Sequence, residues 1–486
     1  MLNHFRLSVS RVVCATIAFS FLFAAVAFAA NPVPTVTAPV HPQAVVPGSG
    51  AFTLTVYGAN FVSGAVVNWN GSPRSTTFVS ARELQAKILA ADVAKATAGY
   101  ITVTNPAPGG GPSSSSYAIV EVHTPTKTVV PGQPIWYQLG GDGIFFLTTG
   151  DFYNHHRLDL LAGGGTGNVY LMKNKGNGTF PQTSMVGHNY FAAGCNSPMS
   201  LAVGDFNNDG KLDFLFSAGK YQQTASIQMR LGNGKGKFQT SWWFGKYLVC
   251  PDFAVGDFNG DGNLDFAAVG PDFGVQIFLG NGDGTFRQGA TYGNLPGAYA
   301  PVVADFNDDG KLDLVVDSGV GVSLLLGNGD GTFQNPQTIL STAEGCGYGV
   351  PIATNDFNGD GKMDLGFCSI TAQMGVLLGN GDGTFQKPSY YHAGTNYTTW
   401  TFAAGDFNSD GDTDFVVWYF TENPQYKPFF ATLLGNDDGT FRHETTVNFP
   451  DTFQELVIVP GDFNSDGLLD FVMLPGAGGV RSYLQK

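Results

Sequence analysis

Residues 305–313 read Asp-Phe-Asn-Asp-Asp-Gly-Lys-Leu-Asp, and variants of this phrase occur seven times in a chain of 486 residues. Successive copies start 48 residues apart at the closest (257 to 305) and 56 at the widest (406 to 462). A second phrase, Leu-Gly-Asn-Gly-Asp-Gly-Thr-Phe or a variant, follows each of the first six copies. The copies start at Asp151, Asp205, Asp257, Asp305, Asp356, Asp406 and Asp462.

A repeat of about 50 residues can hold four short strands, which is the period of a β-propeller blade. In the fourth repeat we expect strands at Pro301–Ala304, Leu312–Val316 and Val322–Leu326, with an outer strand beginning at Phe333. The inner strands are continuously apolar, as strands covered on both faces are. The sequence therefore predicts an all-β chain whose residues 123–486 form a seven-bladed β-propeller.

The last repeat stops at Lys486 without an outer strand, whereas Ile135–Leu139 reads as a strand that belongs to no repeat. We expect that early segment to pair with the last blade, because closing a ring removes two exposed sheet edges. The alternative is an open array of repeats.

The repeated phrase has the residue types of a calcium loop. Calcium prefers six to eight oxygen ligands, and positions 1, 3 and 5 of the loop carry Asp, Asn and Asp. Glycine at position 6 permits a sharp turn, the carbonyl of position 7 can face inward, and Asp at position 9 closes the shell. The predicted ligands are Asp205, Asn207, Asp209, Lys211 and Asp213; Asp257, Asn259, Asp261, Asn263 and Asp265; Asp305, Asn307, Asp309, Lys311 and Asp313; Asp356, Asn358, Asp360, Lys362 and Asp364; Asp406, Asn408, Asp410, Asp412 and Asp414; and Asp462, Asn464, Asp466, Leu468 and Asp470.

About six Ca²⁺ ions are expected, since magnesium demands tighter geometry and zinc favours His or Cys ligands. The alternative is a set of metal-free turns, because Asp, Asn and Gly are common turn residues. The first copy departs from the pattern at Tyr153, His155 and His156, so no calcium is expected there. Its two histidines could bind another metal, although such a pair is more often a solvated turn.

Composition limits the compartment and the partners. The formal net charge of −15 argues against nucleic acid, which requires clustered Lys and Arg. Residues 1–30 read as a signal peptide, with Arg6 and Arg11 before an apolar run and small residues at a cleavage site. A membrane anchor is the alternative. We expect a secreted or cell-surface monomer without a transmembrane segment in the mature chain. Disulfide pairing is left open for Cys195, Cys250, Cys346 and Cys368.

Residues 31–122 differ from the rest of the chain. Short strands are expected at Thr53–Val56, Ala65–Trp69, Leu84–Ile88, Tyr100–Val103 and Tyr117–Val122, with the spacing of a β-sandwich. Phrases such as Gly58-Ala59-Asn60-Phe61 and Val103-Thr104-Asn105-Pro106 resemble the IPT/TIG family of immunoglobulin-like domains. The resemblance implies a spacer or contact module.

The repeats of residues 123–486 resemble the FG-GAP/VCBS family, which includes the propeller of integrin α subunits. That resemblance implies that the loops bind calcium and brace the blades, while ligands contact loops on the opposite face. It also implies that positions 1, 3, 5, 7 and 9 of the six intact loops are the metal ligands.

Two functions remain open. The first is cell adhesion or binding of an extracellular protein or a carbohydrate, for which exposed aromatic rings are suited. Candidate rings are Trp242, Trp243, Tyr390, Tyr391, His392, Tyr397 and Trp400. Alternatively, these rings pack between blades. The second function is a polysaccharide lyase or hydrolase, but Glu344, Glu422 and Glu455 form no recognisable pair. Without a catalytic motif, the sequence favours binding over catalysis.

Overall fold

A computed structural model gives the fold of this chain. It describes residues 30–113, 118–139, 144–164, 168–188, 200–220, 223–244, 248, 251–318, 321–341, 352–369, 373–392, 398–420, 429–448, 455–475 and 479–486. Within these ranges the ordered elements are strands and no helix occurs, which confirms the all-β class. The described part of the chain accordingly has no helix with the length and apolar character needed to cross a membrane. The predicted signal peptide, apart from Ala30, lies outside the described residues.

The N-terminal unit consists of two sheets packed face to face. One has the order β1-β3-β7-β6, and the other β2-β10-β8-β4-β5 with β9 on β8. The bounds are β1 Thr35–His41, β2 Ala44–Val45, β3 Phe52–Ala59, β4 Val66–Trp69, β5 Ser72–Pro73, β6 Ser75–Phe78, β7 Glu83–Ile88, β8 Thr97–Asn105, β9 Gly111–Pro112 and β10 Ala118–Val122. Buried residues such as Val56, Trp69 and Ile101 form the core between the sheets. The five expected strands are present as β3, β4, β7, β8 and β10, although Tyr117 itself lies outside the described residues.

Seven four-stranded antiparallel sheets follow in the described residues. The first three are β12 Ile144–Gly150, β13 Asp159–Gly164, β14 Val169–Lys173 and β15 Gln182–Gly187; β16 Leu201–Gly204, β17 Asp213–Lys220, β18 Gln223–Gly232 and β19 Phe238–Phe244; and β20 Asp252–Gly256, β21 Asp265–Gly270, β22 Gly274–Gly280 and β23 Phe286–Tyr292. The next three are β24 Tyr299–Ala304, β25 Asp313–Ser318, β26 Gly321–Leu325 and β27 Gln337–Ser341; β28 Ile352–Asn355, β29 Asp364–Ser369, β30 Gln373–Leu377 and β31 Ser389–His392; and β32 Thr398–Gly405, β33 Asp414–Phe420, β34 Phe429–Gly435 and β35 Phe441–Asn448. The last contains β36 Glu455–Gly461, β37 Asp470–Pro475, β38 Gly479–Tyr483 and the early strand β11 Ile135–Gln138.

The first strands of successive sheets contact each other, and β36 contacts β12, so the seven sheets close a ring. Strand β11 pairs antiparallel with β38, with Ile135 opposite Ser482 and Gln138 opposite Gly479. The predicted pairing of the early segment with the last repeat is therefore confirmed.

Burial varies across each sheet as the sequence predicted. The middle strands β21, β22, β25 and β26 are buried along their whole length, because neighbouring sheets cover both of their faces. The outer strand β15 is largely exposed, and β27 is exposed at Gln337 and Thr338. One expected boundary was wrong: β27 begins at Gln337, whereas Phe333 forms an isolated bridge to Gly327.

The two repeated phrases interlock neighbouring sheets. The Phe that follows the first Asp contacts the last Phe of the glycine-rich phrase in the next sheet, as in Phe258 with Phe333, whose ring centroids are 5.3 Å apart. In the same junction the Gly331 N–H donates to the Phe258 carbonyl at 2.9 Å. The pair Phe463 and Phe180, at 5.7 Å, makes this contact between the last sheet and the first. Two phrases from different repeats thus form one joint, which explains why they recur together.

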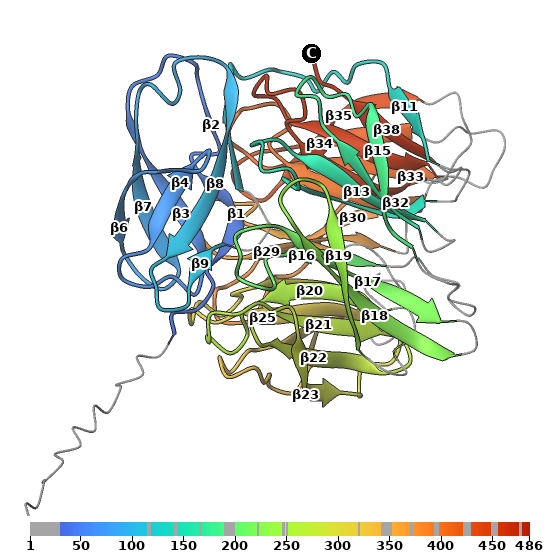
Figure 1. Cartoon of the computed structure of the whole chain (residues 1–486). Coiled ribbons are helices and arrows are strands. Elements are labelled where there is room, and N and C mark those ends of the chain that lie inside the picture. Colours follow the sequence, from blue (N-terminus) through green and yellow to red (C-terminus); the bar gives the residue numbers. More distant parts are fainter. Residues whose placement is uncertain are drawn as a thin grey trace, which may run out of the picture.

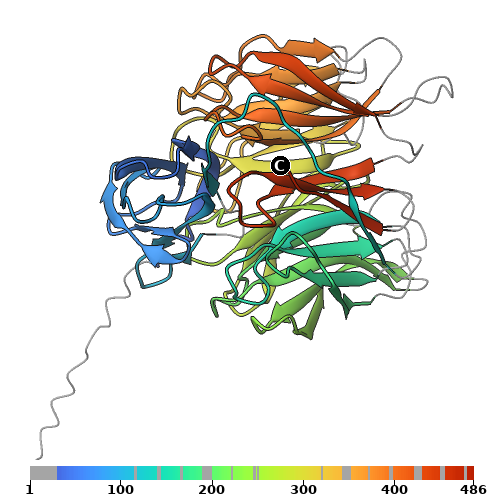
Figure 2. The same cartoon turned by 90° about the horizontal axis from the view of Figure 1, so that it is seen from above.

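The N-terminal unit lies against the face of the ring that carries the aspartate loops. Figures 1 and 2 show it in blue, beside the ring rather than within it. Hydrogen bonds join residues more than 200 positions apart, such as Val33 with Asp257 and Tyr100 with Asp462. This placement puts most of the loops at an interface instead of on an open surface.

Candidate metal centre in the aspartate loops

Each copy of the repeated phrase connects the first and second strands of its sheet. We number the loops by repeat: loop 1 is 151–159, loop 2 is 205–213, loop 3 is 257–265, loop 4 is 305–313, loop 5 is 356–364, loop 6 is 406–414 and loop 7 is 462–470. In every loop the Asp at position 1 directly follows the first strand, and the Asp at position 9 is the first residue of the second strand. Strand pairing therefore fixes both ends of the loop.

Loop 4 shows the local geometry of the intact copies. Oδ1 of Asp305 accepts the N–H of Asp309 at 3.1 Å, and Oδ2 accepts the N–H of Gly310 at 2.8 Å. Oδ1 of Asn307 accepts the Asp309 N–H at 3.2 Å. The φ of Gly310 is +81°, a conformation that glycine adopts without strain. The tight turn therefore turns the side chains of positions 1 and 3 toward the backbone of position 5.

The fully buried Asp at position 9 connects three parts of its sheet. Oδ2 of Asp313 accepts the Phe306 N–H at 2.9 Å, and Oδ1 accepts the Gly327 N–H at 2.8 Å. The same pair of bonds occurs in the other loops, with Asn174 replacing the glycine in loop 1 and Gln485 replacing it in loop 7. The sequence predicted a metal ligand here and gave no sign of this structural role. Each oxygen keeps a second lone pair, so the role does not exclude a cation.

The carboxylate at position 5 has a competing partner in all six intact loops. Where position 7 is Lys, its Nζ lies close to that carboxylate, at 3.1 Å for Lys311 and Asp309. In loops 3, 6 and 7, which lack this Lys, the position 3 amide donates to it instead, at 2.8 Å for Asn408 and Asp410. The structure thus groups positions 1, 3 and 5 in one turn, while one oxygen of position 5 faces another partner that a bound cation would have to displace.

Burial raises the pKa of many loop carboxylates above its ordinary value. The pKa of Asp313 is raised to about 7, and those of Asp265 and Asp470 to about 8, chiefly because burial disfavours the charged form. Position 1 follows the same trend, with pKa values raised to about 6 for Asp257 and Asp462. A buried carboxylate of this kind is stabilised by a proton or by a cation.

Loop 1 has a different arrangement, as its sequence indicated. His155 lies between two carboxylates, with Nδ1 3.1 Å from Asp151 Oδ1 and Nε2 3.2 Å from Asp159 Oδ1. In the described part of the chain, only this trio of His, Cys or acidic side chains has ligand atoms within 4.8 Å of one another. The imidazole ring of loop 1 therefore fills the space between the carboxylates of positions 1 and 9.

The N-terminal unit places donor groups on the position 1 carboxylates of three loops. The Val33 N–H donates to Asp257 Oδ2 at 2.8 Å, and Arg82 Nε lies 2.9 Å from Asp305 Oδ2. His41 Nε2 lies 3.4 Å from Asp356 Oδ2. Sequence analysis missed all three contacts, and no sequence signal could have revealed them because they arise only when the two units dock.

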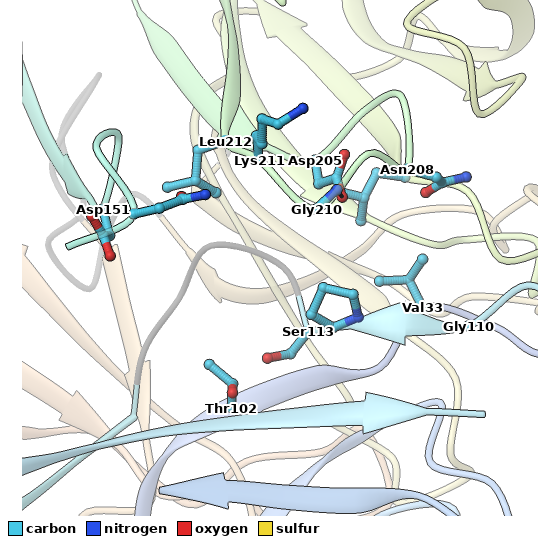
Figure 3. Close-up of a pocket in the computed structure, with 13 residues that line it drawn as sticks. Val33, Thr102, Gly110, Ser113, Asp151, Asp205, Asn208, Gly210, Lys211 and Leu212 are labelled. Atoms are coloured by element: carbon cyan, nitrogen blue, oxygen red, sulfur yellow. Dashed lines mark hydrogen bonds between the residues drawn. The ribbon is translucent and has the colours of Figure 1, made fainter. Parts of the chain in front are cut away.

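A cleft separates the N-terminal unit from loops 1 and 2 (Figure 3). Its two adjoining parts have volumes of about 150 and 340 Å³ and share Thr102, Asp151, Asn154 and Gly210 in their walls. Asn70, Tyr100 and Arg157 also line the larger part. Loops 1 and 2 thus line this cleft, with His156 of loop 1 close to Gly71, whereas loops 3 to 7 form hydrogen bonds or ion pairs with the N-terminal unit.

Most of the other candidate residues are not placed. Tyr397, Glu344, Glu422, Cys195, Cys250 and Cys346 lie outside the described residues, and no side-chain position is described for Trp242, Trp243, His392, Trp400 or Glu455. Tyr390 and Tyr391 pack against two hydrophobic clusters between sheets, so for these rings the packing alternative holds. Cys368 is buried in β29.

The family model of the FG-GAP-like repeat matches residues 151–216, 257–316, 317–367 and 356–417. No curated protein sequence matches the chain. Similar solved structures include an Agrocybe aegerita lectin that recognises non-reducing terminal N-acetylglucosamine, with 19% identity over 79% of this chain and 96% of the lectin and a TM-score of 0.47. The BP39L lectin from Burkholderia pseudomallei has 12% identity over 71% and 99%, with a TM-score of 0.49. A rhamnogalacturonan lyase from Bacillus licheniformis has 12% identity over 94% and 91%, with a TM-score of 0.42. The family match shows that residues 151–216 and 257–417 consist of FG-GAP-like repeats.

Proposed function

We propose that this protein is an exported calcium-binding module that binds a glycan or a protein outside the cell. In this proposal the ring of sheets is a seven-bladed β-propeller, and the N-terminal unit is an IPT/TIG-like immunoglobulin domain docked on its loop face. The closed contacts between β36 and β12 and the pairing of β11 with β38 support a ring with no free end. The two packed sheets of residues 35–122 support the sandwich.

The observation that carries the calcium proposal is the repeated burial of acidic side chains in loops 2 to 7. The donor set is oxygen only, and the loop residues Asp257, Asp265, Asp462 and Asp470 are at most 2% exposed. Several buried carboxylates in one turn repel each other unless a cation or protons neutralise them. Calcium suits this set because it accepts carboxylate, amide and carbonyl oxygens in flexible geometry. The residues therefore fit Ca²⁺, and bound calcium would supply positive charge that braces adjacent strands.

Docking of the N-terminal unit leaves the rest of the ring surface accessible for ligand binding. Because that unit contacts loops 3 to 7, a large ligand has little access to them. The strand ends on the opposite face and the exposed outer strands are then the candidate binding surfaces, as the resemblance to integrin-type propellers implies. We propose that calcium acts structurally in this protein and that ligand recognition takes place elsewhere on the ring.

A binding screen against glycans and extracellular proteins tests this function. The mature chain should bind at least one ligand class in about 1 mM calcium. It should lose that binding in EDTA, because the ring is less stable without calcium. Turnover of a polysaccharide by the purified protein would instead support the enzyme alternative. A chain whose melting temperature ignores both calcium and EDTA would contradict the calcium part of the proposal.

A further inference from the structure

Loop 6 receives an acidic side chain from the N-terminal unit, in contrast to the donors that reach loops 3 to 5. Glu121, on β10, is only 2% exposed, and its Oε2 accepts a hydrogen bond from Ser409 Oγ. Its Oε1 is fully buried without a hydrogen-bond partner. A buried carboxylate oxygen that lacks a donor is costly, and either a proton or a cation can stabilise it.

The surroundings of Glu121 are acidic. The charged groups that act on it most strongly are the carboxylates of Asp406, Asp462 and Asp414. Loop 6 also differs from the other intact loops at position 7, where Asp412 replaces the Lys, Asn or Leu found elsewhere. Glu121 therefore lies near acidic side chains of loops 6 and 7 at this part of the interface. Without a cation their mutual repulsion would oppose docking of the two units.

The contacts around Glu121 hold it firmly against loop 6. Gln43 Nε2 donates to the Gly411 carbonyl at 2.9 Å, and the Thr126 N–H donates to the Asn408 carbonyl at 2.7 Å. The Glu121 N–H donates to the Gln43 carbonyl at 2.7 Å. Ser409, between these contacts, is 1% exposed. The backbone around Glu121 is thus tied to loop 6, and the Ser409 hydroxyl orients the carboxylate.

We infer that Glu121 completes the cation site of loop 6, so that one calcium ion is held jointly by the ring and the N-terminal unit. The inference rests on the proposed function, because it assumes calcium in the loops. It goes further by assigning one ligand to a residue outside the repeats. Calcium at loop 6 would then join the two units, and its loss would weaken their docking.

The substitution Glu121→Gln tests this assignment in the full mature chain at about pH 9, above the raised pKa values cited for the loops. It keeps the size and polarity of the side chain and removes one charge. In EDTA the variant should melt at a higher temperature than the wild type, because one repulsive charge is gone. In calcium its gain in melting temperature should be smaller, and calorimetric titration should show one site weakened by about 10- to 100-fold. The remaining sites should keep their affinity.

Gln43→Ala is the matched control, since it removes a neighbouring contact to loop 6 without changing charge. It should lower the melting temperature by the same amount in EDTA and in calcium. Glu121→Asp keeps the charge but retracts it, and should also reduce the calcium gain. An unchanged calcium gain and affinity in both Glu121 variants would overturn the inference, as would a Glu121→Gln chain that cannot fold in EDTA. If the wild type itself binds no calcium, the proposed function fails before this step.

Discussion

At the scale of single residues, positions 5 and 9 of the aspartate loops have separable roles. Asp309 is partly exposed, and its free carboxylate oxygen pairs with Lys311, a contact of the kind that contributes little to stability. Asp313 is fully buried and accepts two backbone N–H groups that join three strands. We therefore expect position 5 to matter mainly when calcium is bound, and position 9 to matter at all times.

Asp309→Ala should lower the melting temperature in calcium and leave it nearly unchanged in EDTA. Loss of one site that is filled at 100 times its Kd would cost about 2.7 kcal/mol. Differential scanning calorimetry with and without EDTA measures both values. Asp330→Ala, in the glycine-rich turn of the same sheet, is the control, since Asp330 is bonded only within its own turn among the described contacts. Equal effects of the two substitutions in calcium would count against a cation in loop 4.

The raised pKa values of position 9 give the metal-free protein an unusual pH dependence. Asp313 has a folded pKa of about 7 against an ordinary value of 3.8, and Asp265 and Asp470 have about 8. Between the ordinary pKa of 3.8 and the raised pKa values, the folded state binds more protons than the unfolded state. The free energy of unfolding therefore falls as pH rises through this range. In EDTA the melting temperature should therefore be higher at pH 5 than at pH 8.

Calcium should reverse this trend, because it binds the ionised carboxylates and competes with protons. The calcium-dependent gain in melting temperature is expected to be small at pH 5 and large at pH 8. Thermal unfolding at both pH values, each with calcium and with EDTA, gives the four melting temperatures that test this prediction. A metal-free chain that becomes more stable toward pH 8 would show that these carboxylates are not held in a protonated, buried state.

At the scale of elements, the joint between neighbouring sheets is the unit that repeats. Phe258 is 3% exposed and contacts Phe333 of the next sheet, while the intervening backbone is tied by the Gly331 N–H. The seventh sheet has no glycine-rich phrase to offer loop 6. There Gln485 Nε2 donates to the Phe407 carbonyl at 2.8 Å, so the last residues of the chain replace the missing phrase.

Phe258→Ala should destabilise the protein by about 3 to 5 kcal/mol, since it leaves a cavity between two sheets. The double variant with Phe333→Ala should cost less than the sum of the single changes, with a coupling of about 0.5 to 1.5 kcal/mol. Chemical denaturation measures each term. Phe78→Ala on the exposed edge of the N-terminal unit, where Phe78 is 38% exposed, should cost far less. Strict additivity at Phe258 and Phe333 would rule out a shared joint.

The elements that sequence reasoning predicted are those with strong local patterns. The inner strands are continuously apolar, and the loops carry fixed Asp and Gly positions, so both were found. Strands β1 and β6 were missed: β1 contains Pro39, and β6 reads Ser-Thr-Thr-Phe with mostly exposed side chains. Strand β6 lacks the alternating apolar pattern that marks a half-buried strand. Strand β1 does alternate, with Val36, Ala38 and Val40, but a proline inside a run argues against a strand. Phe333 was assigned to the start of an outer strand because it follows the turn made by the glycine-rich phrase, but its ring packs against Phe258.

At the scale of the whole molecule, docking of the two units could not be predicted from the sequence. Val33, Arg82 and Glu121 belong to an unrepeated segment, and their partners lie more than 200 residues away along the chain. No local pattern encodes such contacts. The same contacts decide which loops are covered and which face the cleft, and therefore which surfaces can meet a ligand.

Arg82 should make docking sensitive to charge. Its guanidinium lies 2.9 Å from Asp305 and 2.5 Å from Asp308, and Asp305 is only 2% exposed. Removing one partner of a buried ion pair leaves the other uncompensated and typically costs about 3 to 5 kcal/mol. Arg82→Gln should therefore loosen the N-terminal unit in EDTA, visible as a larger radius of gyration by small-angle scattering and as faster proteolysis of residues 123–134.

Calcium in loop 4 would replace the lost positive charge beside Asp305, so the effect of Arg82→Gln should shrink when calcium is added. Arg74→Gln is the matched control, because Arg74 pairs with Asp92 inside the N-terminal unit, 2.6 Å away, and its other side-chain hydrogen bonds, to the Ser72 and Pro73 carbonyls, also stay within that unit. That variant should leave the radius of gyration and the proteolysis rate unchanged. If both variants behave alike, charge at the interface does not hold the units together, and their docking must depend on the neutral hydrogen bonds of Val33, Gln43 and Tyr100 instead.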